Sequence, residues 1–354
     1  MARALELAAR GLYTTPPNPR VGCVLVKDGA MIGEGWHEKP GLAHAEVNAL
    51  RAAVAAGHSA AGATAYVTLE PCNHQGRTPP CSGALIEAKV ARVIAAMRDP
   101  NTKAGGGFER LQAAGIETQC GLLEAEARAL NPGFISLMTR GRPWLRLKVA
   151  ASLDGKTALE NGQSQWITGP EARRDGHHFR AQAGAVLTGI GTVKDDDPRL
   201  SVREVETPRQ PLRVVVDSRF EIPLSAKIFE GGNVLVATAQ ENPAKSAALR
   251  SMGADTLRLP NPEGKVDLAE LLRELGQREI NEVQVEAGVR LNGSLLREGL
   301  VDELLIYLAP MLIGDTARGM FSLPPLAELT AAKRLEIFDQ RMLGADLRVR
   351  ARLQ

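Results

Sequence analysis

A chain of 354 residues is longer than a single hydrophobic core usually serves, so two domains of ordinary size are expected. Apolar residues make up 44% and charged residues 24%, as in globular proteins, and no apolar run approaches the length of a membrane span. The 43 Lys and Arg residues nearly balance the 41 Asp and Glu residues, and aromatic residues make up only 4%. This composition argues against nucleic-acid and membrane partners and favours a small-molecule ligand.

The first segment, "MARALELAARG", alternates apolar and charged residues and predicts an amphipathic helix rather than a secretory signal. The chain has four cysteines. Without an export signal, so few cysteines argue against a disulfide scaffold. We therefore expect a cytoplasmic protein with reduced thiols.

Alternating strand and helix patterns follow this first helix. Strands are predicted where residues rich in Val, Thr and Tyr are closed by Gly or Pro, and helices where apolar residues recur at helical spacing. The predicted strands are 21–29, 63–70, 91–97 and 116–121, and the predicted helices are 45–57, 82–90, 107–115 and 125–138. Alternation of this kind predicts an α/β fold with a sheet covered by helices.

Gly141 and Pro143 interrupt this series, and a new strand is predicted to begin near Trp144. A second α/β series then runs through the segments 183–193, 211–218, 233–239, 282–288, 303–312 and 347–353. We place the domain boundary within 141–146, which gives an N-terminal domain at 1–143 and a C-terminal domain at 144–354.

Two cysteines, Cys72 and Cys81, flank the loop in "LEPCNHQGRTPPCSGAL". The expected compartment disfavours a disulfide, and two unrelated loop cysteines are the plainer alternative. The segment "HAE" at 44–46 favours a metal, because catalytic zinc takes three protein ligands and leaves a fourth position for water. His44, Cys72 and Cys81 would supply one nitrogen and two thiolates. Cys81 is also predicted to open a helix, where the positive end of the dipole favours a thiolate.

Glu46, two residues beyond His44, is the predicted catalytic residue, placed to move a proton between water and a leaving group. A lone Glu on a helix is usually solvated, but the ordered set H-x-E…P-C…C is the pattern of zinc nucleobase deaminases. Eight residues, "NHQGRTPP", separate the cysteines here, where that pattern has a short C-x-x-C, so a structural zinc site remains an alternative. His74 and Arg77 in the loop favour a substrate pocket, since a guanidinium suits a phosphate or carbonyl. Hydrolytic deamination is the predicted reaction.

The second half of the chain carries weaker signals. A G-x-G begins at Gly189, but the third glycine of the dinucleotide fingerprint does not follow, and turn glycines are an equally good interpretation. In "EAGVRLNGSLL" a strand ends at Glu286 and a turn at Gly288 precedes a helix, whose first N–H groups would suit a pyrophosphate. Cys23 and Cys120 are expected to be buried thiols.

Motifs in both halves resemble one family, the bifunctional riboflavin-biosynthesis deaminase/reductases. The deaminase half carries "NPRVGCVLVKDG", "HAEVNAL", "TLEPCNHQGRTPPC" and "MRDPN", and the reductase half carries "KVAASLDGKTA", "SQWITG", "GTVKDDDPRLSVR", "VVVDS", "VEAG" and "LVDELLIYLAPMLIG". The resemblance implies a cytidine-deaminase-like α/β/α domain followed by a dihydrofolate-reductase-like α/β domain. It further implies zinc-dependent deamination of 2,5-diamino-6-(5-phosphoribosylamino)pyrimidin-4-one, then NADPH-dependent reduction to 5-amino-6-(5-phosphoribitylamino)uracil. The implied enzyme is a homo-oligomer that acts on phosphoribosylaminopyrimidines.

The resemblance also assigns residues. Besides the zinc ligands and Glu46, it implies a deaminase substrate pocket that contains Asn18, His74, Arg77, Asp99 and Asn101. The residues implied to hold NADPH are Ala150, Trp166, Thr192, Asp196, Ser218, Gly288, Val289, Arg290, Leu291, Asn292, Gly293 and Ser294. Those implied to hold the reductase substrate are Lys156, Ser164, Arg180, Leu200, Arg203 and Glu286. On composition alone, Arg180 could instead lie on the surface and Trp166 in an ordinary core.

Three positions depart from the usual motifs of the family. Asn73 stands in "CNH" where "CSH" is usual, Asn48 in "HAEVN" where "HAEVH" is usual, and Gly169 in "WITG" where "WITS" is usual. None is a predicted metal ligand or the predicted proton shuttle. The expected chemistry is therefore unaffected, while fine substrate contacts near these positions are open.

Three competing hypotheses remain at this point. A nucleic-acid deaminase would share the zinc core but should carry a basic, aromatic surface and would not need a second domain. A structural zinc site joined to a binding module predicts that replacement of Glu46 leaves all function intact. In the third, only one half of the chain is active.

Overall fold

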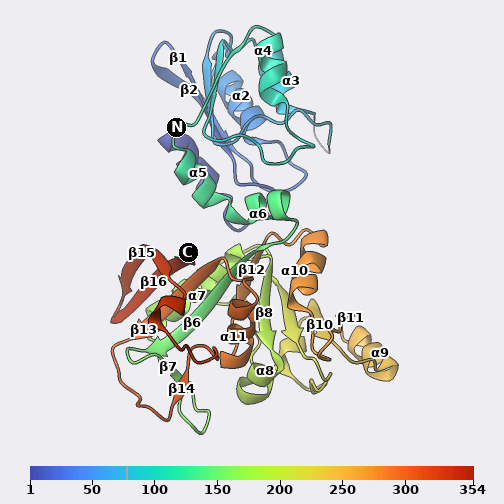
Figure 1. Ribbon diagram of the computed structural model, residues 1–354. Coiled ribbons are helices and arrows are strands. Elements are labelled where there is room, and N and C mark those ends of the chain that lie inside the picture. The colour runs from blue at the N-terminus through green and yellow to red at the C-terminus, as the bar shows by residue number, and fades with distance from the viewer. Residues whose placement is uncertain (77–78) are drawn as a thin grey trace. The chain divides into compact units, whose positions relative to one another are not determined.

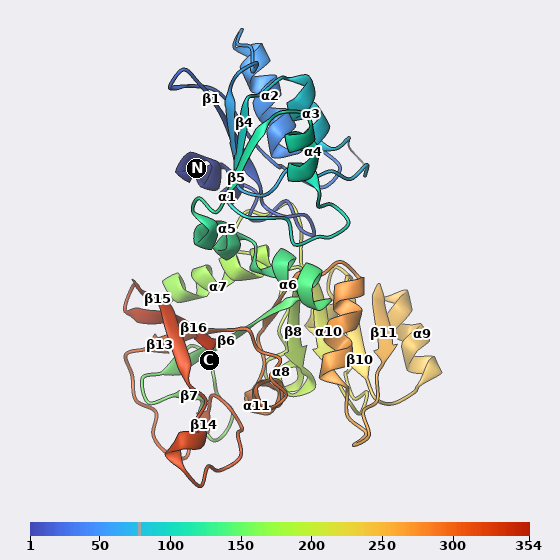
Figure 2. The ribbon, with the colours of Figure 1, turned by 45° about the horizontal axis from the view of Figure 1, so that its top comes forward.

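The computed structural model describes residues 1–76 and 79–354, and its chain divides into two compact units, Met1–Gly141 and Arg142–Gln354 (Figure 1). Each unit has its own sheet with helices packed on it (Figures 1 and 2). The mixed α/β architecture predicted for both halves is confirmed.

The first unit is built on a five-stranded sheet in the order β2-β1-β3-β4-β5. Its strands are β1 (Gly22–Lys27), β2 (Ala30–Trp36), β3 (Thr64–Val67), β4 (Arg92–Ala95) and β5 (Glu117–Cys120). Its helices are α1 (Ala2–Ala9), α2 (Ala45–Ala55), α3 (Cys81–Glu87), α4 (Gly107–Ala113), α5 (Glu124–Leu130) and α6 (Pro132–Arg140). Strand β1 is antiparallel to β2 and β3, whereas β3, β4 and β5 run parallel.

Two glycines let helices approach the first sheet on opposite faces. A Cβ at Gly22 would lie 2.0 Å from the Ala4 carbonyl oxygen of α1, and a Cβ at Gly35 would lie 2.5 Å from the Ala49 nitrogen of α2. Gly35 pairs with Cys23, the residue next to Gly22, and successive strand residues face opposite sides of a sheet. Helices α1 and α2 therefore cover opposite faces, which gives three α/β/α layers.

Two expectations for the first unit are wrong. The single helix predicted at 125–138 is two helices, because Pro132 has no N–H to donate and begins α6 instead. Asn131, at the break, is buried and exchanges hydrogen bonds with the backbone of Arg20 at 2.8 and 2.9 Å. Cys120 is exposed rather than buried, because it lies on β5, the outer strand of the sheet; Cys23 is buried as expected.

The second unit contains a nine-stranded sheet in the order β11-β10-β9-β8-β12-β6-β13-β16-β15. Its strands are β6 (Trp144–Ser152), β8 (Ala185–Gly189), β9 (Leu212–Val216), β10 (Val234–Thr238), β11 (Ala254–Arg258), β12 (Glu282–Val285), β13 (Glu303–Ala309), β15 (Leu335–Leu343) and β16 (Asp346–Leu353). The small strands β7 (Lys156–Ala158) and β14 (Arg318–Gly319) pair separately. From β11 through β10, β9, β8, β12 and β6 to β13, neighbouring strands run parallel. At the other edge, β16 is antiparallel to both β13 and β15.

Helices cover both faces of the second sheet. They are α7 (Pro170–Gln182), α8 (Ile190–Asp196), α9 (Pro243–Ser251), α10 (Leu268–Gln277) and α11 (Val289–Arg297), with short 3-10 helices at Lys227–Phe229 and Leu329–Ala331. Leu147 and Val285 face the large core that contains residues of α10 and α11. The opposite face of these strands is polar. On that face the Gln284 side chain donates to the Gly176 carbonyl of α7 at 3.5 Å. Buried polar residues on the middle strands therefore lie under α7.

Candidate functional site

Three predicted metal ligands meet in the first unit. His44 is the N-cap of α2, Cys81 is the first residue of α3, and Cys72 lies in the loop that precedes it. His44 Nδ1 is 3.6 Å from Cys72 Sγ and 3.3 Å from Cys81 Sγ, and all three ligand atoms lie within 4.8 Å of one another. One imidazole nitrogen and two sulfurs are the ligand types of catalytic zinc sites, so the residues fit the predicted ion.

The pKa values of the two cysteines of this cluster shift in opposite directions. The hydrogen bond with the Cys81 side chain, helped by His44, lowers the pKa of Cys72 to about 4, against the effect of burial. The same hydrogen bond, together with burial, raises the pKa of Cys81 well above its ordinary value. The Cys81 backbone N–H also donates to Cys72 Sγ at 3.4 Å. Both sulfurs bind a cation as thiolates, so a cation that binds the set displaces the thiol protons.

Glu46 lies beside this cluster on the first turn of α2. Its side chain is buried, with 3% of the residue exposed. Burial, followed by the negative charge of Cys72, raises the pKa of Glu46 to about 7. A carboxyl group with a pKa near neutrality can accept a proton and return it in the same reaction.

Four of the other predicted residues of the deaminase pocket lie on loops of the first unit. The Asn18 side chain is 3.0 Å from His37, and the Asn101 N–H donates to Asp99 Oδ1 at 2.8 Å. Burial, followed by the charges of Glu70 and Cys72, raises the pKa of Asp99 to about 6, against the effect of the Asn101 hydrogen bond. His74 lies in the loop between the two cysteines. Arg77 lies outside the described residues.

The three departures from the family motifs have structural partners. Asn73 accepts a hydrogen bond from Arg110 Nη1 at 2.9 Å, and Asn48 donates to the Trp36 carbonyl at 2.9 Å. Gly169 is the N-cap of α7 in the second unit. These residues therefore hold loops and a helix start, and none is a metal ligand.

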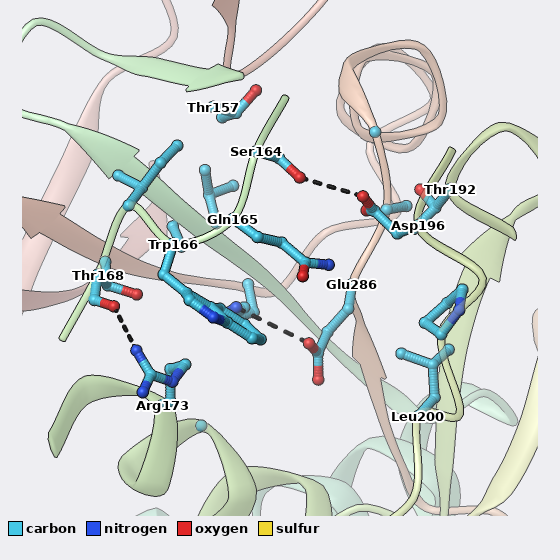
Figure 3. A pocket seen from close by; sticks show the side chains of 18 of the residues that line it. Thr157, Ser164, Gln165, Trp166, Thr168, Arg173, Thr192, Asp196, Leu200 and Glu286 are labelled. Carbon is cyan, nitrogen blue, oxygen red and sulfur yellow. Dashed lines mark hydrogen bonds and ion pairs between the residues drawn. The ribbon is translucent and has the colours of Figure 1, made fainter. Parts of the chain in front are cut away.

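A cavity of about 730 Å³ occupies the second unit, beyond the carboxyl ends of β8 and β12 (Figure 3). Strand order switches direction here: β9 to β11 follow β8 on one side, while β6 and β13 lie on the other side of β12. Ligands of open α/β sheets bind at such switch points. In Figure 3 the side chains of Gln165, Trp166 and Glu286 converge on the pocket.

Twelve predicted residues line this cavity: Ala150, Ser164, Trp166, Arg180, Thr192, Asp196, Leu200, Arg203, Glu286, Gly288, Val289 and Asn292. Six others do not: Lys156, Ser218, Arg290, Leu291, Gly293 and Ser294. Gly293 has a packing reason for being glycine, because a Cβ there would lie 2.1 Å from the Ser322 carbonyl oxygen. Ser218 Oγ accepts the Val266 N–H at 3.0 Å, which joins the loop after β9 to the segment before α10.

A buried ion cluster lines part of the cavity. Arg180 binds Glu286 through two hydrogen bonds, of 2.5 and 2.8 Å, and Lys148 Nζ lies 3.8 Å from the same carboxylate. Gln284 also donates to Glu286, at 2.9 Å. Although burial opposes it, these partners, Arg180 foremost, hold the pKa of Glu286 well below its ordinary range. Glu286 is therefore a carboxylate, and Arg180 is not a surface residue.

Trp166 is also placed differently from an ordinary core residue. It is 68% exposed although it lines the cavity, and the Arg173 guanidinium lies over its ring at 4.6 Å. Nearby, Ser164 Oγ donates to Asp196 Oδ1 at 3.1 Å, which joins the loop before α7 to α8. An open aromatic face at the cavity rim suits stacking of a flat ligand ring.

Several residues that line the cavity are not among those predicted from the sequence, including Lys148, Arg173 and His177. A signal for Lys148 was present, because it alternates with Leu147 and Val149 in the strand "WLRLKVAAS" and so faces away from the apolar core. No comparable signal marked Arg173 or His177, since α7 is polar over most of its length and nothing in the pattern tells which turn faces the cavity.

His177 gives the second unit a testable pH dependence. Burial, followed by the charges of Arg180 and Arg203, lowers the pKa of His177 to about 4, and its Nδ1 accepts the Arg203 N–H at 3.2 Å. Because the unfolded state binds this proton near pH 6.5, we expect stability to be complete above that pH and to fall towards pH 4. The expected loss is about 2 kcal/mol at pH 5. Denaturant titrations from pH 7.5 to 5 would measure it, and a His177→Gln variant that loses as much stability as wild type would contradict the prediction.

The cavity residues also fit a dinucleotide. The start of α11 at Gly288 and Val289 opens into the cavity, and its backbone N–H groups suit a pyrophosphate. Asn292 is buried and donates to the Ala287 carbonyl at 3.1 Å, while its Oδ1 has no hydrogen-bond partner among the described residues. That acceptor is suited to a ligand donor.

A zinc-type ligand set beside a buried glutamate is the arrangement of a metal-dependent deaminase, and the separate α/β unit has a cavity that fits the dinucleotide of a reductase. Comparisons with known proteins give the family. Residues 143–346 match the RibD C-terminal domain, and residues 1–97 match the cytidine and deoxycytidylate deaminase zinc-binding region. The chain belongs to the RibD family of bifunctional deaminase/reductases of riboflavin biosynthesis, with a zinc-binding deaminase domain and an NADPH-dependent reductase domain.

Relatives in this family match the chain along almost its whole length. The riboflavin biosynthesis protein RibD of Escherichia coli is 49% identical over 361 residues, covering 98% of this chain and 96% of the relative. RibD of Acinetobacter baumannii has a solved structure with a TM-score of 0.91 and 46% identity, covering 100% of this chain and 97% of that one. A Thermotoga maritima deaminase/reductase has a TM-score of 0.88 and 34% identity, with 100% and 97% coverage. None of the described helices is both long and apolar enough to span a membrane.

Proposed function

We propose that residues 1–143 deaminate 2,5-diamino-6-(5-phosphoribosylamino)pyrimidin-4-one and that residues 144–354 then reduce its ribosyl group to give 5-amino-6-(5-phosphoribitylamino)uracil. The Thermotoga maritima relative is described as a diaminohydroxyphosphoribosylaminopyrimidine deaminase/5-amino-6-(5-phosphoribosylamino)uracil reductase. The observation that carries the proposal is the meeting of His44, Cys72 and Cys81 beside buried Glu46 in one unit, with a separate polar cavity in the other.

In the deaminase unit, His44, Cys72 and Cys81 hold the zinc ion, and Glu46 moves the proton. The ion, when bound, supplies the positive charge that lowers the pKa of a bound water. Glu46 takes a proton from the attacking water and passes it to the departing amino group, a task that suits its raised pKa. The substrate-pocket residues in this proposal are Asn18, His74, Arg77, Asp99 and Asn101.

In the reductase unit, NADPH supplies the hydride, and the chain binds and orients both ligands. The proposed cofactor residues are Ala150, Trp166, Thr192, Asp196, Ser218 and 288–294, and the proposed substrate residues are Lys156, Ser164, Arg180, Leu200, Arg203 and Glu286. The Arg180 guanidinium already donates hydrogen bonds to Glu286 and to the Ser201 carbonyl. Arg203, which lines the cavity and is exposed, is therefore the better placed of the two arginines for the substrate phosphate.

A coupled assay tests the proposed function. Purified, zinc-loaded protein is given the diaminopyrimidine phosphate and NADPH, and released ammonia and NADPH oxidation are followed together. Ammonia release followed by NADPH oxidation is the expected result. Ammonia without NADPH oxidation would refute the reductase assignment, and NADPH oxidation only from the already deaminated compound would refute the deaminase assignment.

We also propose that the enzyme acts in the cytoplasm, on small molecules. The support is chemical: all four cysteines are free, and two of them serve in the proposed zinc site. Thiolate ligands of this kind persist where thiols are kept reduced. Location of the tagged protein by fractionation, beside a cytoplasmic marker, tests this.

Self-association is a further part of the proposal, and the outer edge of the large sheet supports it. Strand β15 ends the nine-strand order, so its outer backbone groups have no neighbouring strand in the described chain, and its side chains Ile337 and Met342 are exposed. Unpaired apolar edges favour pairing with another copy. We expect Ile337→Lys to shift sedimentation towards the monomer, whereas exchange of exposed Val54 for Lys on α2 should not. A monomeric wild type would refute the proposal.

A further inference from the structure

His37 is a buried polar residue of the deaminase unit to which the proposed chemistry gives no role. It follows β2, is 3% exposed, and packs edge-on against the ring of His44, with 5.1 Å between ring centroids. Each ring nitrogen meets one neutral partner: Nδ1 lies 3.3 Å from the Ala43 carbonyl oxygen, and Nε2 lies 3.0 Å from the Asn18 side chain. His37 therefore stands between a proposed metal ligand and a proposed substrate residue.

The two partners determine the tautomer of His37. A carbonyl oxygen only accepts hydrogen bonds, so Nδ1 must carry the proton that faces Ala43. With the Nδ1 proton directed at Ala43, Nε2 of the neutral imidazole is an acceptor, and Asn18 Nδ2 lies 3.0 Å from it. Asn18 must then present its Nδ2 amide group to the ring, because its Oδ1 could not donate. The orientation of the Asn18 amide follows from the ring and not from Asn18 itself.

Asn48 contacts the Ala43 carbonyl, at the end of the hydrogen-bond chain that runs from Asn18 through His37. Its Nδ2 donates to the Trp36 carbonyl at 2.9 Å and lies 3.4 Å from the same Ala43 oxygen that His37 contacts. The Ala43 carbonyl is therefore held between two donors. This gives Asn48, one of the departures from the family motif, a place in the positioning of Asn18.

We propose that His37 is a positioning residue of the deaminase, which turns the Asn18 amide so that Oδ1 accepts a hydrogen bond from an N–H group of the aminopyrimidine substrate. This inference rests on the proposed function. Oδ1 of Asn18 has no hydrogen-bond partner among the described residues, whereas the amide nitrogen is used by His37. An amide turned the other way would present donors to a substrate edge that itself donates, and the pairing would be lost.

The test separates positioning from metal support. His37→Phe, which keeps a flat ring and removes both nitrogens, is compared with Asn18→Ala, with the double variant, and with His58→Phe, which changes an exposed histidine of the same unit. Zinc content is measured for each. Binding of the diaminopyrimidine phosphate is measured by calorimetry in a Glu46→Gln background, where turnover does not interfere, and KM and kcat are measured with Glu46 intact.

We expect full zinc content in every variant, and substrate binding about tenfold weaker in both single variants, since one lost hydrogen bond costs about 1.4 kcal/mol. The double variant should bind no more weakly than Asn18→Ala, and the effect should fall on KM more than on kcat. His37→Gln, whose side-chain oxygen can accept from Asn18, should restore most of the binding, and this variant replaces His37→Phe if the latter does not fold.

Three outcomes would overturn the inference. Unchanged substrate binding in His37→Phe would show that the Asn18 amide takes its orientation without the hydrogen bond to His37. Additive losses in the double variant would show that the two residues act independently. Loss of zinc would make His37 a support of His44 instead. Failure of wild type to bind the pyrimidine at all would refute the proposed function, and so is distinguishable from these three results.

Discussion

Replacement of Glu46 by Gln is expected to lower kcat for deamination by about 1,000-fold, because general acid–base catalysis contributes about 100- to 10,000-fold. The amide keeps the shape of the side chain but cannot take a proton from water or return one to the leaving group. The residue is buried, so solvent cannot readily replace it. Ammonia release from the diaminopyrimidine phosphate, with zinc content measured on the same sample, is the readout.

Reduction should survive this substitution. The reductase cavity lies in the other compact unit, and none of its lining residues belongs to α2. Given the deaminated compound, Glu46→Gln should therefore oxidise NADPH at the wild-type rate. Glu87→Gln, an exposed glutamate at the end of α3, is the matched control and should retain both activities. Deamination by Glu46→Gln within threefold of wild type would show that another group moves the proton.

The second large effect is expected for Glu286→Gln in the reductase unit. This substitution removes the only charge in the cluster that neutralises both Arg180 and Lys148 among the described residues. Breaking a buried ion pair by removing one partner typically costs about 3 to 5 kcal/mol, because a charge is left buried without its partner. We expect the second unit to lose about 3 kcal/mol of unfolding free energy and reduction to fall by at least about 100-fold.

Lys148 should respond to the same change. Burial already lowers its pKa, and Glu286 is the largest opposing influence. Without that carboxylate the ammonium is disfavoured further, so Lys148 in the variant should lose its proton at a lower pH than in wild type. An additional change in the pH profile of reduction is therefore expected beside the loss of stability.

Trp144 and Trp166 lie in the second unit and Trp36 in the first, so this stability is measured by tryptophan fluorescence during denaturant unfolding in a Trp36→Phe background. Glu230→Gln is the matched control: Glu230 pairs with Arg199 at 2.6 Å, but both side chains are about half exposed. Such surface pairs contribute about 1 kcal/mol or less. Equal losses in Glu286→Gln and Glu230→Gln would contradict the view that burial makes the first cluster costly to break.

The sequence by itself predicted which side chains meet in the first unit. His44, Cys72 and Cys81 are residue types that bind zinc, Glu46 stands in the order of the deaminase pattern, and Cys81 begins a helix as predicted. The α/β class was also predictable, because the spacing of apolar residues along the chain differs between strands and helices. The family resemblance extended this reading to the reductase half and was confirmed by full-length relatives.

Only the tertiary structure decided the environment of each side chain. Nothing in the order of residues says that Arg180 meets Glu286 across 106 positions, that Lys148 joins them, or that Cys120 lies on an outer strand. The same limit hid the chain from Ala43 through His37 to Asn18. Hydrogen-bond direction depends on which polar atoms meet in space, and burial, which sets the pKa values, is a property of packed elements rather than of neighbours in sequence.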